Sequence, residues 1–214
     1  MIKTREVILY TGKTGSGKST LFRENIKKSD RAIIIDTLSE YELLAAPFPA
    51  LFIDTIYQLY DYLAENAHRN FRIVFAADNL DEEITLKDGE TLTVIESVCK
   101  LVYEHLEQIT LGIEELSYFV SPGFAPKYLR RIIRAGRHSG ISLHATTQRP
   151  PEIPPVIRAQ ITKLYSFRQH EPADLQWIER CVGNKTEAQK LRGLERFTWP
   201  GPMVKDRHYK EFIL

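Results

Sequence analysis

Residues 6–20 read EVILYTGKTGSGKST, and this stretch decides the fold. Residues 6–11 suit a buried strand, residues 12–19 fit the pattern G-x-x-x-x-G-K-[ST], and a helical pattern follows from about Ser19 to Lys27. Glycines let the backbone turn sharply and bring its N–H groups to phosphate oxygens, while the helix N-terminus adds partial positive charge. The stretch therefore predicts a phosphate-binding loop between a strand and a helix.

The loop predicts a site for ATP and Mg²⁺. Lys18 is expected to reach the β- and γ-phosphates, and the Ser19 hydroxyl is expected to bind Mg²⁺. The nucleotide-binding residues expected from the motif are Gly12, Lys13, Thr14, Gly15, Ser16, Gly17, Lys18, Ser19 and Thr20. The motif alone does not name a reaction, because kinases, GTPases and motor ATPases all contain it.

Outward from the loop, strand-length apolar runs alternate with helical patterns. Strands are expected at about 32–36, 51–54, 72–77, 109–113, 141–147 and 163–168, and helices at about 55–65, 91–107, 126–138, 172–181 and 186–192. A polar turn containing Asp88-Gly89 is expected before the second of these helices. The alternation predicts an α/β fold with a mainly parallel central sheet flanked by helices, and residues 196–214 are expected to form a terminal hairpin.

Size and composition fit one ATPase domain over residues 1–214. Hydrophobic residues make up 43% and charged residues 27%, and the net charge is only +1. No stretch reaches the ~18–20 apolar residues of a membrane-spanning helix, and residues 1–12 do not resemble a signal peptide. The expected location is the cytoplasm, with Cys99 and Cys181 as reduced thiols and six histidines in no ligand spacing.

Two adjacent acids follow the strand at 109–113. A P-loop hydrolase needs a carboxylate on the Mg²⁺ side of the site and a second group that activates the attacking water. Glu114 takes the first position, as a metal-side ligand with Ser19, and Glu115 takes the second, as the catalytic base. Gln148 ends the next strand and is predicted to sense the γ-phosphate or the attacking water.

Residues 116–151 contain no Asp or Glu and form a locally basic segment. Its cations are Lys127, Arg130, Arg131, Arg134, Arg137 and Arg149. Either these charges line a functional surface, or they form a solvated helix face that acids elsewhere in the fold neutralise.

Three segments together resemble the FtsK/HerA superfamily of P-loop ATPases. They are GKTGSGKS at 12–19, the pair Glu114-Glu115, and RRIIRAGRHSGISLHATTQRPPEIPPVIRAQ at 130–160, which is the most specific. Asp36 with Glu40-Tyr41 is also similar to an acidic turn of that family, and the likeness covers most of residues 6–180. In this family the metal-side acid is usually Asp, so Glu114 is a departure.

The resemblance implies an additional-strand catalytic glutamate (RecA-like) fold, with the sensor strand beside the phosphate-loop strand. It also implies a homo-oligomeric ring of five or six subunits that threads double-stranded DNA without reading its sequence. An arginine would act in trans on the neighbour's ATP, with Arg137 as first choice and Arg134 as second.

The length and the lack of further domains are most similar to viral genome-packaging ATPases, which implies capsid vertex proteins as possible partners. DNA-contacting residues are expected after the second strand or within 79–91, although the acidic run at 79–83 favours an outward position. The alternatives are a HerA-like DNA-processing ATPase, an export or assembly ATPase of the zonula-occludens-toxin type, and a nucleoside kinase. The acid pair and the Thr-Gln-Arg-Pro segment at 147–150 disfavour the kinase.

Overall fold

The structure is a computed structural model that describes residues 5–41, 48–86, 88–198 and 201–214. Contacts divide the chain into two compact units. Unit 1 comprises Arg5, Ile26–Glu114 and Pro126–Leu143, and unit 2 comprises Glu6–Asn25, Glu115–Ala125 and His144–Leu214. The expected single ATPase domain over residues 1–214 stays a prediction.

Unit 1 is built on a parallel sheet in the order β7-β2-β4-β3. Its strands are β2 (Arg31–Ile35), β3 (Leu51–Ile53), β4 (Phe71–Phe75) and β7 (Thr110–Ile113). Side chains of β2 and β4 are buried on both faces, with Ile33, Ile34 and Val74 fully enclosed. Such continuous apolar strands are typical of a parallel sheet covered by helices.

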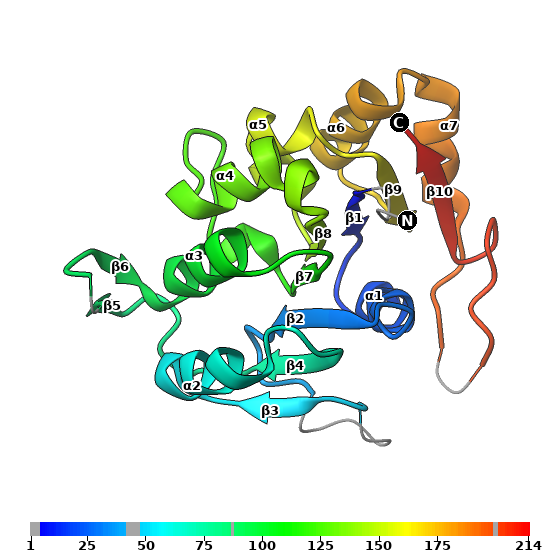
Figure 1. Ribbon diagram of the computed structural model, residues 1–214. Coiled ribbons are helices and arrows are strands. Elements are labelled where there is room, and N and C mark those ends of the chain that lie inside the picture. Colours follow the sequence, from blue (N-terminus) through cyan, green and yellow to red (C-terminus); the bar gives the residue numbers. More distant parts are fainter. Residues whose placement is uncertain (1–4, 42–47, 87, 199–200) are drawn as a thin grey trace. The chain divides into compact units, whose positions relative to one another are not determined.

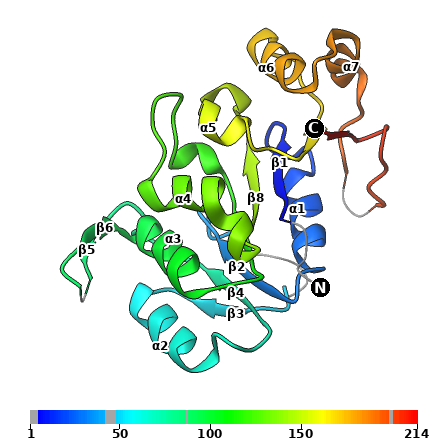
Figure 2. The same cartoon turned by 45° about the horizontal axis from the view of Figure 1, so that its top comes forward.

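Three helices accompany this sheet: α2 (Ile56–Asn66), α3 (Val94–His105) and α4 (Lys127–Ala135). Figures 1 and 2 show α3 and α4 side by side. Thr55 and Thr93 cap α2 and α3, since their hydroxyls accept hydrogen bonds from the N–H groups of Gln58 and Glu96. A 3₁₀ turn, η2 (Gly136–Ser139), follows α4.

The helix expected at 91–107 begins three residues later than predicted. Thr91–Thr93 forms β6, which pairs antiparallel with β5 (Glu83–Thr85) around the Asp88-Gly89 turn. Figure 1 shows this hairpin projecting beyond the start of α3. Pairing with β5 keeps residues 91–93 extended, and Thr93 then caps the helix.

Unit 2 contains the strand run β10-β9-β1-β8. Its strands are β1 (Val7–Thr11), β8 (Ser142–Thr147, in this unit from His144), β9 (Lys163–Phe167) and β10 (Tyr209–Ile213). β1 pairs parallel with β9, and β8 neighbours β1, as the resemblance implies for a sensor strand. Tyr10 is fully buried at the centre of the unit, stacked on Tyr165 at 5.0 Å and edge-on to Phe22 at 5.6 Å.

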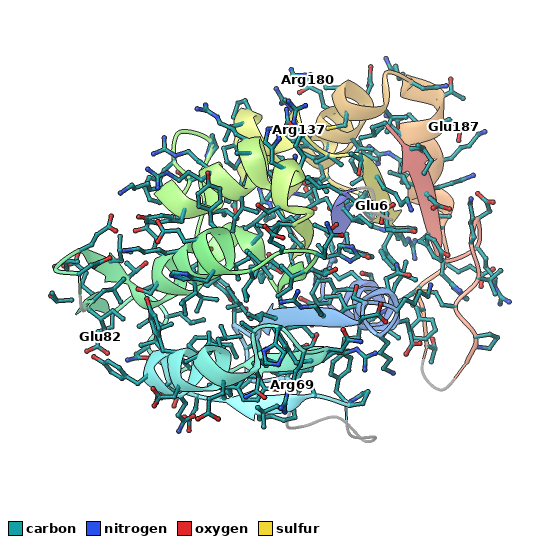
Figure 3. All side chains as sticks on the ribbon, in the orientation of Figure 1. Glu6, Arg69, Glu82, Arg137, Arg180 and Glu187 are labelled. Carbon is teal, nitrogen blue, oxygen red and sulfur yellow. The ribbon has the colours of Figure 1, made fainter. Side chains whose placement is uncertain are left out.

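Unit 2 also contains helices, and the first of them begins at Lys18 of the phosphate loop. They are α1 (Lys18–Ile26, in this unit to Asn25), α5 (Pro155–Arg158), α6 (Pro172–Val182) and α7 (Lys185–Lys190), with short 3₁₀ turns η1 (Leu116–Tyr118), η3 (Pro150–Glu152) and η4 (Leu191–Gly193). Glu187 of α7 lies 3.9 Å from Lys210 of β10, and Figure 3 labels Glu187 on that helix.

The C-terminal segment turns back antiparallel, as expected. The Glu195 N–H donates to the Arg207 carbonyl at 2.8 Å, and β10 then pairs antiparallel with β9. The predicted α/β class, with a mainly parallel sheet, flanking helices and a returning C-terminal strand, is confirmed. Both cysteines are free thiols.

Candidate nucleotide-binding and catalytic site

The phosphate loop lies between β1 and α1, as the motif predicts. Gly15 and Gly17 take left-handed φ values of 70° and 97°, which side chains rarely adopt. The Ser16 N–H donates to the Lys13 carbonyl at 3.1 Å, and the Gly12 N–H donates to the Thr147 carbonyl at 3.2 Å. The loop is thus a tight turn that is tied to the end of β8.

Two polar groups within the loop are buried. The Lys18 side chain is only 9% exposed, and its Nζ lies 3.9 Å from Oε2 of Glu115. The Ser16 hydroxyl has no hydrogen-bond partner in the part of the chain that the structure describes. Burying an ammonium and an unsatisfied hydroxyl is costly unless a ligand completes their bonding. A phosphate group has the charge and the acceptor oxygens to do so, so these residues fit a nucleotide.

Glu115 is held by three hydrogen bonds, which involve its backbone N–H and its Oε1. Its N–H donates to Oγ1 of Thr146 at 2.8 Å, and its Oε1 accepts from the Gln148 N–H at 2.9 Å and from the Ser117 hydroxyl at 2.6 Å. Its φ is 50°, a left-handed conformation that costs an ordinary residue about 1–2 kcal/mol. Unusual backbone of this kind clusters at functional sites, where the surroundings hold it in place.

Gln148 follows the last residue of β8, and its role as a sensor stays a prediction. Its side-chain Oε1 accepts a hydrogen bond from the Thr14 hydroxyl at 2.9 Å, which joins the end of β8 to the phosphate loop. Lys18, Glu115 and Gln148, together with Thr14, therefore come together in unit 2. These four residues come from three separate parts of the chain.

Two further ion pairs connect this site to the start of α6. Lys13 lies 3.1 Å from Glu171, and Nε of Arg149 lies 4.0 Å from the buried carboxylate of Asp174. Burial raises the pKa of Asp174, and the charge of Arg149 partly offsets that rise. The N-terminal end of α6, including its N-cap residue Glu171, therefore contacts both the phosphate loop and the residue after Gln148.

Glu114 and Arg137 belong to unit 1. Glu114 is buried, its N–H donates to the Ile35 carbonyl at 3.0 Å, and its carbonyl accepts from the Thr37 hydroxyl. Arg137 is exposed on η2, and together with burial its charge lowers the pKa of Arg5. Arg134 is exposed at the end of α4. Their roles at the nucleotide stay predictions.

A hydroxyl and a carboxylate are the oxygen donors that Mg²⁺ prefers, so Ser19 and Glu114 fit this ion by type. No cluster of three or more His, Cys, Asp or Glu side chains suited to a metal occurs among the described residues. Asp36 has a structural task, because its carboxylate accepts from the N–H groups of Leu38, Glu40 and Tyr41 and so closes the turn after β2.

The basic segment divides into two sets. Lys127 pairs with Glu90 at 2.6 Å, and Arg131 lies 4.0 Å from Glu104. Acidic residues of unit 1 therefore neutralise these two charges. Arg130, Arg134 and Arg137 are exposed and have no acidic partner within the described ranges. Of the regions expected to touch DNA, residues 42–47 and 87 lie outside the described residues.

The sequence did not reveal that the C-terminal segment lies on the phosphate loop. Nε of Arg196 donates to the Gly15 carbonyl at 3.3 Å, and a Cβ on Gly17 would lie 2.6 Å from Cε of Met203 and 3.0 Å from Cβ of Phe197. No local pattern predicts a contact between residues about 180 positions apart, so only the fold shows it.

Comparison with solved structures agrees with the fold. The structure is similar to that of the genome packaging NTPase B204 of Sulfolobus turreted icosahedral virus 2 in complex with AMP, with a TM-score of 0.65, 22% identity, and 91% of this chain and 90% of that chain covered. This chain therefore has the α/β fold of that NTPase. VirB4 of Thermoanaerobacter pseudethanolicus is also similar, with a TM-score of 0.59, 15% identity, and coverage of 92% of this chain and 86% of that chain.

In sequence, this chain is 30% identical over 106 residues to a probable DNA double-strand break repair helicase HerA of Methanocaldococcus jannaschii. That match covers 48% of this chain and 20% of the relative's length. No family model matches the sequence. Within the described residues, no helix is long and apolar enough to cross a membrane.

Proposed function

We propose that this protein is an ATP-hydrolysing motor that translocates double-stranded DNA and packages a viral genome into a capsid. The single observation that carries the hydrolytic part is Glu115, held by Thr146, Ser117 and Gln148 with Oε2 facing Lys18 at 3.9 Å. A carboxylate fixed next to a phosphate-binding lysine is the arrangement that water activation requires.

Binding of ATP would rest on the phosphate loop. Its backbone N–H groups and the start of α1 would hold the phosphates, and Lys18 would place its buried ammonium against the β- and γ-phosphates. Bound Mg²⁺, held by Ser19 and Glu114, would neutralise charge that develops on the phosphates. Electrostatic stabilisation and positioning therefore supply most of the catalysis.

The proton of the attacking water would pass to Glu115. Its Oε1 is occupied by two hydrogen bonds, which leaves Oε2 to orient the water and accept its proton. Gln148 would report the state of the γ-phosphate, since its N–H holds Glu115 and its side chain holds Thr14. One residue thus contacts both the base and the phosphate loop.

Ring assembly would complete the site in trans. Arg137 of a neighbouring subunit would stabilise charge on the transferring phosphoryl group, a task that suits a planar guanidinium. Its exposed position, with no acidic partner in the described part of the chain, leaves it available for such a contact. Exposed cations such as Arg130 and Arg134 suit contacts with DNA phosphates that carry no sequence information.

The packaging role rests on the similarity in fold to a genome packaging NTPase over nine-tenths of both chains. A DNA-processing ATPase that works like HerA is the second candidate, and the sequence match over 106 residues favours it. Both candidates share ATP hydrolysis coupled to movement along DNA, and they differ in the partner, which is a capsid vertex or a repair nuclease.

The first experiment measures steady-state ATP hydrolysis with and without long double-stranded DNA, over a series of salt concentrations. We expect DNA to stimulate turnover, with stimulation falling as salt rises because the contacts are to phosphates. Glu115→Gln should lower turnover by about 10²–10⁴-fold, the usual contribution of a general base, while ATP still binds.

Glu152→Gln, a carboxylate on η3 outside the proposed site, is the matched control and should keep turnover. Turnover that is indifferent to DNA at every salt concentration would contradict the translocation proposal. Full turnover in Glu115→Gln would contradict the assignment of the base.

A further inference from the structure

The C-terminal segment supplies a charged group to the phosphate loop of the same chain. We name residues 194–198 and 201–208 the C-terminal arm. Nε of Arg196 donates to the Gly15 carbonyl, and a Cβ on Gly15 would lie 2.6 Å from Nη2 of Arg196. The guanidinium therefore lies directly on the loop, in space that the glycine leaves open.

Most of the hydrogen-bonding capacity of Arg196 is unused. The side chain is exposed, its terminal nitrogens donate no hydrogen bond to any described residue, and no carboxylate among those residues pairs with it. A guanidinium presents its donors as a fork that matches phosphate oxygens. The group is thus an unneutralised cation that lies against the phosphate loop.

The arm is anchored well enough to position this cation. The Glu195 N–H donates to the Arg207 carbonyl, and Glu195 pairs with Arg207 at 2.8 Å. The buried Phe197 packs edge-on to His208 at 5.7 Å, and the Val204 N–H donates to Nδ1 of that histidine at 3.0 Å. Both neighbours of Arg196 in the sequence, Glu195 and Phe197, make these contacts, and they hold the backbone of Arg196 in place.

The arm also covers the second left-handed glycine of the loop. Phe197 and Met203 lie against Gly17, just before Lys18 begins α1. Both contacts are apolar, and both cover the loop at the residue before Lys18. Exclusion of water strengthens the electrostatic attraction between a cation and a phosphate.

From these contacts we infer that Arg196 is a nucleotide-phosphate ligand that acts in cis, in addition to Lys18 and distinct from the arginine expected in trans. This inference rests on the proposed nucleotide-binding function and adds a binding residue to that site. The ligand class is a nucleoside di- or triphosphate, because a single phosphate deep in the loop would already be held by Lys18 and backbone N–H groups.

Titration calorimetry with ADP, AMP and the slowly hydrolysed analogue ATPγS tests the inference without DNA and without turnover. Arg196→Ala should weaken binding of ATPγS and ADP about tenfold, the contribution of one hydrogen bond to a charged group, and weaken AMP binding less. Arg196→Lys should recover part of the loss. Arg192→Ala, an exposed arginine of η4 that bonds Gln189, is the matched control and should bind as wild type.

Lys18→Ala distinguishes a failure of the proposed nucleotide site from a failure of the proposed role of Arg196. If Lys18→Ala leaves nucleotide binding intact, the proposed nucleotide site itself is wrong. If Lys18→Ala abolishes binding but Arg196→Ala binds all three nucleotides as wild type, the role of Arg196 is wrong. An equal loss for all three nucleotides, together with a lower Tm without nucleotide, would show that Arg196 only supports the fold of the arm.

Discussion

At the residue scale, the proposed catalytic geometry depends on a hydrogen bond to the backbone of Glu115, the proposed base. Thr146 is buried, and its hydroxyl accepts from the N–H of Glu115, whose φ of 50° is unfavourable. Thr146→Val keeps the shape but leaves that N–H buried without an acceptor. We expect a loss of about 1–3 kcal/mol in the free energy of unfolding and a lower kcat, because Glu115 is no longer held.

The matched control is Thr110→Val in unit 1, where the Thr110 hydroxyl meets that of Ser29 at 2.9 Å. Both variants remove a buried hydroxyl, and urea denaturation with ATPase assays compares them. The control should lose stability and keep kcat. If the folded fraction of Thr146→Val has the kcat of wild type, the backbone of Glu115 needs no such hydrogen bond for catalysis.

At the element scale, Glu90 joins the β5–β6 hairpin to two helices. Lys127 and Tyr128 of α4 and Lys100 of α3 all donate to its carboxylate, and they lower its pKa to about 2. The ordinary pKa of Glu is about 4.3, so the folded state holds this carboxylate charged where the unfolded chain would protonate it. The resulting stabilisation is complete above about pH 5 and is lost as pH falls towards 2.

Denaturation of wild type and Glu90→Gln between pH 7 and pH 2 measures this contribution. The wild type should be the more stable protein near neutrality, and the difference should shrink below pH 5. Glu83→Gln, an exposed carboxylate on β5, is the control and should follow the wild-type curve. A constant difference between wild type and Glu90→Gln at every pH would rule out this ionic link.

The same hairpin shows where sequence reasoning is limited. Runs such as VILYT and RAIII, and the glycine loop between β1 and α1, predict their elements because local propensity and burial agree. Thr91–Thr93 is different, since helical spacing continues into it while β-branched residues beside an Asp-Gly turn favour a hairpin. The contact of Arg196 with Gly15 has no local signal at all, because it depends on how distant segments fold.

At the scale of the whole molecule, the proposed site requires residues from two copies of the chain. Glu115→Gln retains Arg137 but lacks the base, whereas Arg137→Ala retains the base but lacks the trans arginine. Each variant alone should be nearly inactive, since an arginine finger contributes ~10³–10⁵ in rate. A one-to-one mixture should recover about a quarter of wild-type turnover, the share of randomly paired interfaces that are intact.

Turnover of the mixture under ring-forming conditions, measured against each variant alone, checks this expectation. Arg130→Ala mixed with Glu115→Gln controls for the loss of a neighbouring exposed cation and should retain the activity of the Arg130→Ala subunits. A mixture no more active than its components would mean that Arg137 does not act across an interface.

The antiparallel pairing of β10 with β9 has a consequence for handling the protein. β10 forms the backbone hydrogen bonds on one side of β9. β9 consists mostly of buried residues, which include Leu164 and Phe167. Proteolytic cleavage before Tyr209 would expose unpaired backbone N–H and C=O groups along β9. A strand of another chain can form hydrogen bonds with these groups. Preparations clipped at this point should therefore form intermolecular β-structure and precipitate, even though the phosphate loop itself is intact.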